Sequence, residues 1–253
     1  MMLPSATHLV LIPTYNAGPR LLATVRGALE HWQPVWVVVD GSTDGSADAV
    51  VELAEQNPQV RVIERSHNGG KGAAVATGVA AAIDAGFTHV LTMDSDGQHP
   101  ADHIPAFMAA SQAQPAALVV GRPIFGPEAP LARLQGRKLS VWLARVEILG
   151  RGIDDPLFGF RVYPAAKLAR AFDATRRARG FDFDPEMAVR LVWAGVPTVN
   201  LPAPCRYLAK DEGGVSHFHY LRDNLKLIWL HTRLLTQLLL WRWVGVLRCR
   251  RLS

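Results

Sequence analysis

The sequence predicts an α/β fold built on a mainly parallel sheet with helices on both faces. Within the first 121 residues, short apolar runs rich in β-branched side chains alternate with segments of helical character. Runs that are apolar throughout are typical of strands buried on both faces, and parallel strands need helices as crossovers. With 253 residues and 49% hydrophobic side chains, the chain can form a packed core.

The order of the expected elements follows from these runs. Strands are expected at 8–13, 35–40, 60–64, 89–94 and 117–121, and helices near 19–31, 46–56, 70–85 and 102–112. From 122 to 182 the pattern is irregular and rich in Gly, Pro and Arg, with further helices expected at 131–149, 184–194 and, as one helix or two, 216–247. We therefore divide the chain into a domain over 1–215 and a C-terminal amphipathic helical extension over 216–253.

The net charge of +5 is concentrated in the tail. Beyond Asp223 the sequence contains six Lys or Arg and no Asp or Glu, so residues 1–223 carry 21 basic against 22 acidic side chains. A basic surface spread over the fold is not expected, which argues against a nucleic-acid partner. Cys205 and Cys249 suggest neither a disulfide framework nor a zinc site, so we expect a reducing cytoplasm. No secretory signal or membrane-spanning run is apparent.

Polar side chains follow the strand that is expected to end at Asp94. Asp94, Asp96 and Gln98 alternate along the sequence MDSDGQHP, so in an extended segment their oxygens would line one side. Mg²⁺ and Mn²⁺ prefer such ligands and often join carboxylates to substrate phosphates. The alternative is a solvated turn, because Asp, Ser and Gly are ordinary turn residues. His99 receives no role from this pattern.

Two other strand ends and one glycine-rich segment could contact a nucleotide. Asp40 ends an apolar run, where a carboxylate can hydrogen-bond a base or ribose, and Tyr15 can offer a ring surface. The alternative is that Asp40 and Tyr15 only belong to turns, the turn after Asp40 leading to a helix cap. The segment NGGKGAAV at 68–75 does not fit the P-loop or the dinucleotide-binding spacing. Lys71 could start a helix that lies near a nucleotide. Alternatively, the segment is a plain helix start without a ligand.

Taken together, these motifs resemble family 2 glycosyltransferases with a GT-A fold. The resemblance rests on IPTYN, VVVDGSTDGS, NGGKGAAVATG, MDSDGQHP and GFDFDPEMAVRLVWAG in this order, and covers about residues 8–205. The variant DSDGQHP is similar to the dolichyl-phosphate or polyprenyl-phosphate mannose (or glucose) synthase branch.

The resemblance implies roles for the matching positions in binding a nucleotide-sugar donor. Asp40 would contact the nucleoside, Asp94 the ribose or diphosphate, and Asp96 and Gln98 the divalent cation, Mg²⁺ or Mn²⁺. The other expected donor-binding residues are Pro13, Tyr15, Asn16, Lys71, Arg133 and Arg137. Family members often have an acidic residue where this chain has Ala17, so the donor nucleotide, UDP or GDP, stays open.

Glycosyl transfer also needs catalytic groups. Expulsion of a diphosphate develops negative charge, which Arg122, Arg133 and Arg137 could neutralise, although a single such residue is more often a surface arginine. Asp184 aligns with the family's general base, whereas a helix start with Pro185 and Glu186 in its first turn explains it as well. If the acceptor is an anionic lipid phosphate, Asp184 need only orient it. We expect Asp94, Arg122 and Asp184 to be catalytic.

The tail suggests where the acceptor lies. Its basic and polar side chains fall on one helical face and its leucines on the other, which fits a helix at an anionic membrane surface. The basic and polar set is Arg222, Lys226, Arg233 and Gln237, and the apolar set is Leu221, Leu225, Ile228, Leu235 and Leu239. A helix packed on the core, or against a second copy in a homo-oligomer, is the alternative.

The sequence therefore predicts an inverting, metal-dependent glycosyltransferase. It would move a sugar from a nucleotide-diphosphate donor to a lipid-linked acceptor such as polyprenyl phosphate, as a peripheral protein at the cytoplasmic face of the membrane. Two alternatives are a glycosyltransferase that acts on a soluble or polymer hydroxyl and a non-catalytic protein that binds nucleotide sugars or lipids.

Overall fold

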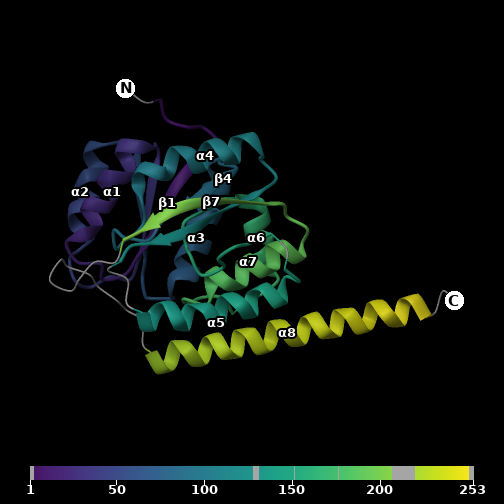
Figure 1. The fold of residues 1–253 in the computed structure, drawn as a ribbon. Helices are drawn as coiled ribbons and strands as arrows, with labels where there is room; N and C mark the ends of the chain where they lie inside the picture. Colours follow the sequence, from purple (N-terminus) through teal and green to yellow (C-terminus); the bar gives the residue numbers. More distant parts are fainter. Residues whose placement is uncertain (1–2, 128–130, 151, 176, 207–219, 251–253) are drawn as a thin grey trace.

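A mixed seven-stranded sheet forms the centre of the fold in the computed structural model (Figure 1). Its strands are His8–Thr14 (β1), Val35–Asp40 (β2), Val60–Arg65 (β3), His89–Thr92 (β4), Leu118–Phe125 (β5), Arg161–Pro164 (β6) and Thr198–Cys205 (β7). The order across the sheet is β3-β2-β1-β4-β6-β5-β7. Only β6 runs antiparallel to its neighbours, so the prediction of a mixed, mainly parallel sheet is confirmed.

The structure describes residues 3–127, 131–150, 152–175, 177–206 and 220–250, and within these only the backbone of 131–134, 136, 220–224 and 241–250. The helices are Arg20–His31 (α1), Asp48–Gln56 (α2), Lys71–Asp84 (α3), Ile104–Ala113 (α4), Leu131–Glu147 (α5), Ala165–Asp173 (α6), Phe183–Trp193 (α7) and Tyr220–Arg250 (α8), with a 3₁₀ turn at Ala101–His103.

The two faces of the sheet bury separate hydrophobic clusters, as the alternation of side chains along a strand requires. In β1, Leu9 and Leu11 belong to the cluster covered by α3, α6 and α7. Val10 and Ile12 belong to the cluster on the other face, under α1, α2 and α4. Because both faces are covered, the strands are apolar throughout, which is why the sequence revealed them.

Two strands and one helix lie in regions that the sequence left irregular or unassigned. β6 contains a fully buried arginine, Arg161, and spans only four residues, so it carries no apolar run. β7 contains Pro202 and Pro204, which weaken the strand signal of its sequence, and it lies at an edge of the sheet, where prolines are tolerated best. α6 follows β6 directly and was missed with it.

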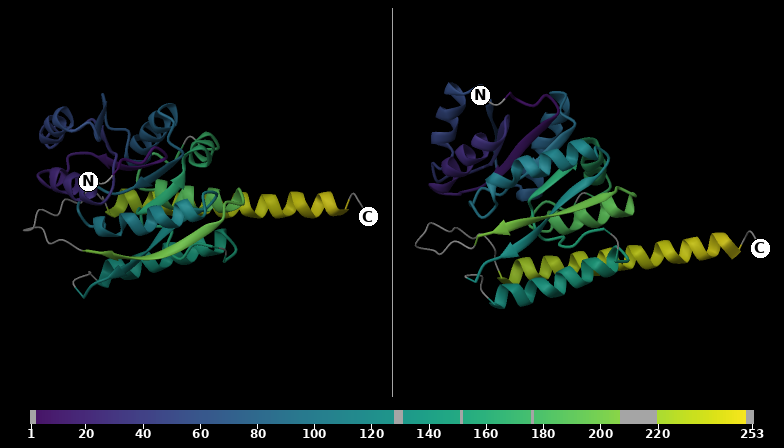
Figure 2. Two further views of the ribbon diagram at one scale, coloured as in Figure 1. Left: turned by 90° about the horizontal axis from the view of Figure 1, so that it is seen from above. Right: turned by 45° about the horizontal axis from the view of Figure 1, so that its top comes forward.

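A single long helix, α8, lies beside α5 and extends beyond the rest of the fold (Figures 1 and 2). Leu230 and Leu234 are buried in the same cluster as Phe183 of α7. The expectation that Arg233 lies on an outer polar face is wrong, because its guanidinium pairs with the buried carboxylate of Glu186. None of the helices, searched over the described residues, is both long enough and apolar enough to span a bilayer.

Two histidines stack at the opposite end of the sheet from the carboxyl ends of the parallel strands. His8 and His89 are register partners on β1 and β4, with ring centroids 4.3 Å apart and planes 5° from parallel. The Nε2 atom of His8 also lies 3.1 Å from the hydroxyl of Ser111. Burial, and secondarily the neighbouring His89, lower the pKa of His8 to about 4.

This stacked pair predicts a loss of stability in mild acid. Because the folded pKa of His8 lies below the unfolded value of 6.5, its contribution is complete above pH 6.5 and is lost as the pH falls toward 4. We expect the free energy of unfolding, measured in urea at several pH values, to fall by up to about 1.4 kcal/mol per pH unit in this window. His8→Gln should flatten the profile and His67→Gln should not. Parallel profiles for wild type and His8→Gln would contradict the assignment.

Candidate active site

The polar motifs converge at the carboxyl ends of the parallel strands. The loops after β1, β2 and β4 leave the same edge of the sheet, where ligands bind in open α/β folds. α3 and α7 reach this edge with their N-terminal turns, which carry Lys71 and Asp184. The sequence motifs that are far apart along the chain therefore form one site.

A lysine held between two carboxylates forms the centre of the site. The Nζ atom of Lys71 lies 2.6 Å from Oδ1 of Asp94 and 2.7 Å from Oδ2 of Asp184. Only 13% of the lysine side chain is exposed. Burial by itself would lower the pKa of Lys71, but the two carboxylates outweigh it and raise the pKa above the usual range. The lysine is therefore a permanent ammonium ion.

Close backbone approach explains the glycines around this lysine. Gly70 has a φ of +90°, and a Cβ atom there would collide with the carbonyl oxygen of Arg179. A Cβ on Gly72 would collide with the carbonyl oxygen of Ala178. The NGGKG segment thus serves to seat the loop before α7 against the start of α3, which brings Asp184 to Lys71.

A buried arginine fixes the backbone beneath Asp184. Arg161 is fully buried and donates hydrogen bonds to the carbonyl oxygens of Phe158, Pro156 and Asp184, at 2.8, 2.5 and 2.7 Å. The second carboxylate oxygen of Asp184, Oδ1, is buried without a hydrogen-bond partner. Asp184 does not cap α7, since the helix begins at Phe183 and has no side-chain cap bond. Its carboxylate is directed into the site instead.

His99 organises the turn that carries Asp94. The backbone N–H of Asp94 donates to Nδ1 of His99 at 3.0 Å, which leaves the ring proton on Nε2, 3.6 Å from Oδ2 of the same aspartate. The ring packs edge-on against Phe158 and Phe160. Burial lowers the pKa of His99 despite the nearby Asp94 and Asp96 carboxylates, so the imidazole is neutral at pH 7. The sequence pattern alone assigns this histidine no role.

The residues expected to hold a cation fit one chemically. Asp96 accepts the backbone N–H of Gln98 through Oδ1, and burial together with the charge of Asp94 raises its pKa. Lys71 lowers the pKa of Asp94 in spite of burial. The carboxylates of Asp94, Asp96 and Asp184 lie within electrostatic reach of two described cationic side chains that interact with Asp94, namely Lys71 and Arg161, so the formal charge of this set is −1. Among the described residues no group of three His, Cys, Asp or Glu side chains could hold a metal alone. A cation here would need the Gln98 oxygen or ligand oxygens in addition.

A network of short polar contacts joins the residues that were predicted to bind the nucleotide. Asp40 is buried, accepts backbone N–H groups of Gly69 and Gly70 at 2.7 to 3.1 Å, and pairs with Arg65 at 2.9 Å. Asn16, with a φ of 45°, accepts the N–H of Thr43 through its side chain and so joins the loops after β1 and β2. Asp40 therefore shapes the loop that presents Lys71. Pro13 is buried in β1, and Tyr15 is half-buried directly after it.

The predicted arginines lie apart from the central lysine. Arg122 on β5 has 58% of its side chain exposed, with its NH1 atom 3.9 Å from Asp154. Arg137 on α5 forms a two-bond fork with Asp155, both distances 2.7 Å. The side chain of Arg133 falls outside the described part of the structure. The structure thus brings Lys71, Asp94 and Asp184 into direct contact, whereas the two described arginines contact other residues.

Comparison with known sequences agrees with this site. The profile of Glycosyl transferase family 2 matches residues 9–172, which contain the loops after β1, β2 and β4. The chain belongs to glycosyl transferase family 2. It is 30% identical over 201 residues to the undecaprenyl-phosphate mannosyltransferase of Micrococcus luteus, covering 77% of this chain and 81% of that protein. It is 30% identical over 206 residues to the polyprenol monophosphomannose synthase of Mycolicibacterium smegmatis, covering 79% and 77%.

Solved structures share the GT-A fold with this family 2 glycosyltransferase. Glucosyl-3-phosphoglycerate synthase from Mycobacterium tuberculosis, in complex with Mn²⁺, UDP and phosphoglyceric acid, superposes with a TM-score of 0.60 at 20% identity, covering 82% of this chain and 73% of that one. S. aureus TarS 1-349 with UDP-GlcNAc superposes with a TM-score of 0.55 at 15% identity, covering 90% and 66%. These similarities concern the fold.

Two further residues complete the lysine's surroundings in this glycosyltransferase and carry no sequence signal of their own. Arg161 would be read from the sequence as a surface arginine in an irregular segment. A Cβ on Gly159 would lie 2.6 Å from Nζ of Lys71, so only glycine leaves room for the ammonium group there. The carbonyl oxygen of Gly159 accepts a hydrogen bond from Thr92 at 2.7 Å, which fixes its position. Only the three-dimensional contacts reveal these functions.

Gly159→Ala should separate the position of Lys71 from the stability of the fold. The added methyl group meets the end of a flexible side chain, so the chain should fold while the ammonium group moves away from Asp94 and Asp184. We expect glycosyl transfer to slow about tenfold or more, or ~1.4 kcal/mol in the activation barrier.

The matched control for this experiment is Gly27→Ala in α1, where the new Cβ finds an ordinary contact at 3.7 Å. Thermal unfolding should show both variants folded, with only Gly159→Ala impaired in transfer. Full activity in Gly159→Ala would mean that the lysine's position is not critical.

Proposed function

We propose that this family 2 glycosyltransferase is an inverting enzyme that transfers a sugar from a UDP- or GDP-sugar to polyprenyl phosphate at the cytoplasmic face of a membrane. The main support from the structure is the ammonium group of Lys71 between Asp94 and Asp184 at the donor edge of the sheet. The two relatives named for polyprenyl-phosphate mannosyl transfer, each aligned over more than three quarters of this chain, support the acceptor class.

The reaction is a single displacement at the anomeric carbon of the sugar. An oxygen of the acceptor phosphate forms a bond to this carbon, while the bond to the donor diphosphate breaks and both its electrons leave with the diphosphate oxygen. A phosphate monoester is already anionic and needs no general base. We infer that Asp184 orients the acceptor and that the Lys71 ammonium holds this carboxylate and that of Asp94 in place.

The remaining residues are proposed to bind the donor. Asp40, Asn16, Pro13 and Tyr15 would form the nucleoside end of the site. Asp96 and Gln98 would hold Mg²⁺ or Mn²⁺, whose charge would neutralise the diphosphate as it leaves. Arg122, whose side chain is exposed on β5, could bind the phosphate of either substrate. A role of Arg133 and Arg137 in donor binding remains a prediction.

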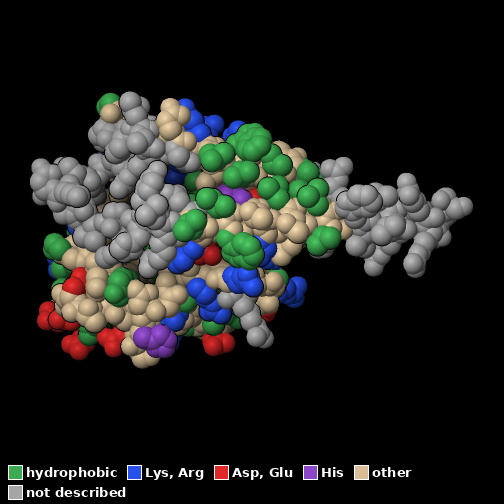
Figure 3. Space-filling model, turned by 90° about the horizontal axis from the view of Figure 1, so that it is seen from below, with side chains coloured by type: hydrophobic (Ala, Val, Ile, Leu, Met, Phe, Trp, Pro, Cys, Tyr) green, Lys and Arg blue, Asp and Glu red, His purple; other side chains and the backbone are tan. Residues whose placement is uncertain are grey.

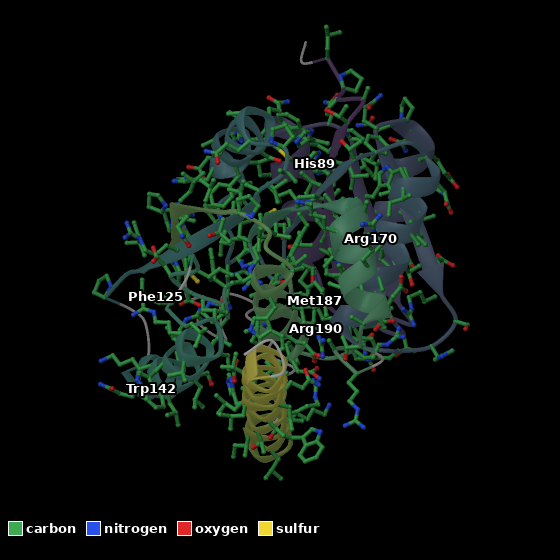
Figure 4. All side chains as sticks on the ribbon, turned by 90° about the vertical axis from the view of Figure 1, so that its right-hand side faces the viewer. His89, Phe125, Trp142, Arg170, Met187 and Arg190 are labelled. Atoms are coloured by element: carbon green, nitrogen blue, oxygen red, sulfur yellow. The ribbon has the colours of Figure 1, made fainter. Side chains whose placement is uncertain are left out.

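The lipid acceptor places the enzyme at a membrane, and one face of the structure fits this location. Large apolar side chains are exposed on α5, at Leu149 just after it, and on α8. They gather on the side of the molecule seen in Figure 3. We call them the apolar face: Leu139, Trp142, Val146, Leu149, Leu225, Ile228, Trp229, Leu239 and Leu240. Figure 4 shows Trp142 at the lower margin of the molecule, on the same side as α8.

Charges around the apolar face match an anionic lipid surface. Lys138, Arg145 and Lys226 are exposed on the same two helices. The guanidinium carbon of Arg177 lies 6.0 Å from the ring centre of Trp229. The only acidic side chain of α5, Glu147, is fully buried. Apolar side chains flanked by basic ones are typical of interfacial helices, so we propose that α5 and α8 together rest on the membrane.

A thermal-shift experiment with nucleotide sugars tests the donor site. We expect one UDP- or GDP-sugar to raise the melting temperature in the presence of Mn²⁺. At a ligand concentration one hundred times Kd, binding adds about 2.7 kcal/mol to the free energy of unfolding. Asp96→Asn and Gln98→Ala should lose this shift, because both remove an oxygen ligand or its charge. The exposed Asp102→Asn on the following turn is the matched control.

The same preparations, given the donor and polyprenyl phosphate, should release nucleoside diphosphate and form a glycosylated lipid. Transfer to a soluble hydroxyl compound instead would favour the first alternative function, and binding without turnover the second. Full transfer by Asp96→Asn and Gln98→Ala would show the metal assignment to be incorrect.

Sedimentation with vesicles of phosphatidylethanolamine and phosphatidylglycerol tests the apolar face. Trp142→Glu and Trp229→Glu should each lower partitioning about tenfold, because they put a carboxylate where an indole would enter the interface. Ile83→Glu, an equally drastic change at an exposed position on α3, should leave it unchanged. If the tryptophan variants instead dissociate a dimer while vesicle binding is unaffected, the face is an interface between two copies.

A further inference from the structure

A buried ion pair joins α8 to the helix that carries Asp184. Glu186 of α7 is fully buried, and its two carboxylate oxygens are bound by different arginines. Oε1 accepts from Nε of Arg190 at 2.8 Å, within α7, and Oε2 accepts from NH2 of Arg233 at 2.5 Å, from α8. Figure 4, viewed nearly along α8, shows Met187 and Arg190 of α7 directly above this helix.

Asp184 and Glu186 share the first turn of α7, so the placement of one constrains the other. The carboxylate of Asp184 points to Lys71, whereas that of Glu186 points to Arg233. The backbone N–H of Glu186 donates to the carbonyl oxygen of Asp182, which closes this turn. Rotation of α7 about its axis, or withdrawal of α8, would therefore move both carboxylates.

A second buried polar contact fixes α8 along α5. Nδ1 of His231 lies 2.8 Å from Oε1 of Glu147, and both side chains are buried. Nε1–H of Trp193, at the end of α7, donates to the carbonyl oxygen of Glu147 at 2.9 Å. α5, α7 and α8 are thus joined at both ends of α7, and α8 cannot slide without breaking one of the buried pairs.

Stability alone does not explain the Glu186–Arg233 pair. A buried ion pair contributes little more than well-packed apolar side chains would, because both charges are removed from water. Leu230 and Leu234 are already buried in the hydrophobic cluster that also contains Phe183 and Met187. What the charged pair adds is directionality, since its hydrogen bonds are satisfied in only one orientation of the two helices.

We propose that Glu186 and Arg233 are positioning residues that make the placement of Asp184 depend on the seating of α8. The inference rests on the proposed function, in which Asp184 contacts the acceptor. The helix that contributes to the apolar face would then also hold the acceptor-binding carboxylate, so that transfer is fast only when α8 is seated on α7.

The test compares Arg233→Met with Arg233→Lys in the full-length protein. Arg233→Met keeps the length of the side chain and removes its donors, and we expect kcat with polyprenyl phosphate to fall about tenfold while KM for the nucleotide sugar stays within about twofold. Arg233→Lys restores a donor and should recover much of kcat. Thr232→Val, whose hydroxyl bonds only within α8, is the matched control.

Hydrogen exchange gives a readout that does not depend on activity. In Arg233→Met, amide exchange in the first turn of α7 should accelerate, and in Thr232→Val it should not. If Arg233→Met does not fold, Glu186→Gln, which keeps the shape of the side chain, should show the same two effects. A lower melting temperature with unchanged kcat per folded molecule would overturn the proposal, as would unchanged exchange in α7. Absence of transfer in the wild type would instead refute the proposed function.

Discussion

The contact of the Lys71 ammonium with Asp94 and Asp184 is the interaction on which the site depends. It joins the first residue of α3, the loop after β4 and the first turn of α7. Three charged groups removed largely from water are stable only when each has its partner, so the geometry is determined jointly. The glycines at 70, 72 and 159 and the buried Arg161 are the conditions under which this contact can form.

The chemistry of the site follows from an unequal charge. The described side chains around the lysine retain an excess negative charge, and a nucleoside diphosphate would increase it. This excess supports the proposal that a cation binds together with the donor at the oxygen-rich sequence DSDGQ. Neutral His99 contributes shape and no charge, and it holds the turn that contains Asp96.

Much of the fold could be predicted because buried parallel strands and their crossover helices have simple sequence patterns. β1 to β5 and most helices lie close to the expected ranges. β6 and β7 were missed because a buried arginine and two prolines obscure their strand character. The predicted site residues Lys71, Asp94 and Asp184 meet, but the sequence contained no sign that the lysine contacts both carboxylates. Glu186 looked like a helix-start residue, and Arg233 like a surface charge, because an ion pair 47 positions apart leaves no local pattern.

The antiparallel strand β6 also has a consequence for how the chain reaches its native state. It lies between β4 and β5, so those two strands, although made earlier during synthesis, have no direct pairing with each other. β5 and β7 can join the rest of the sheet only through residues 161–164, and such long-range pairing is slow. Asp184 follows soon after β6, and α8 comes last. We therefore expect the N-terminal strands to assemble first, with the ion-paired centre completed only near the end of folding.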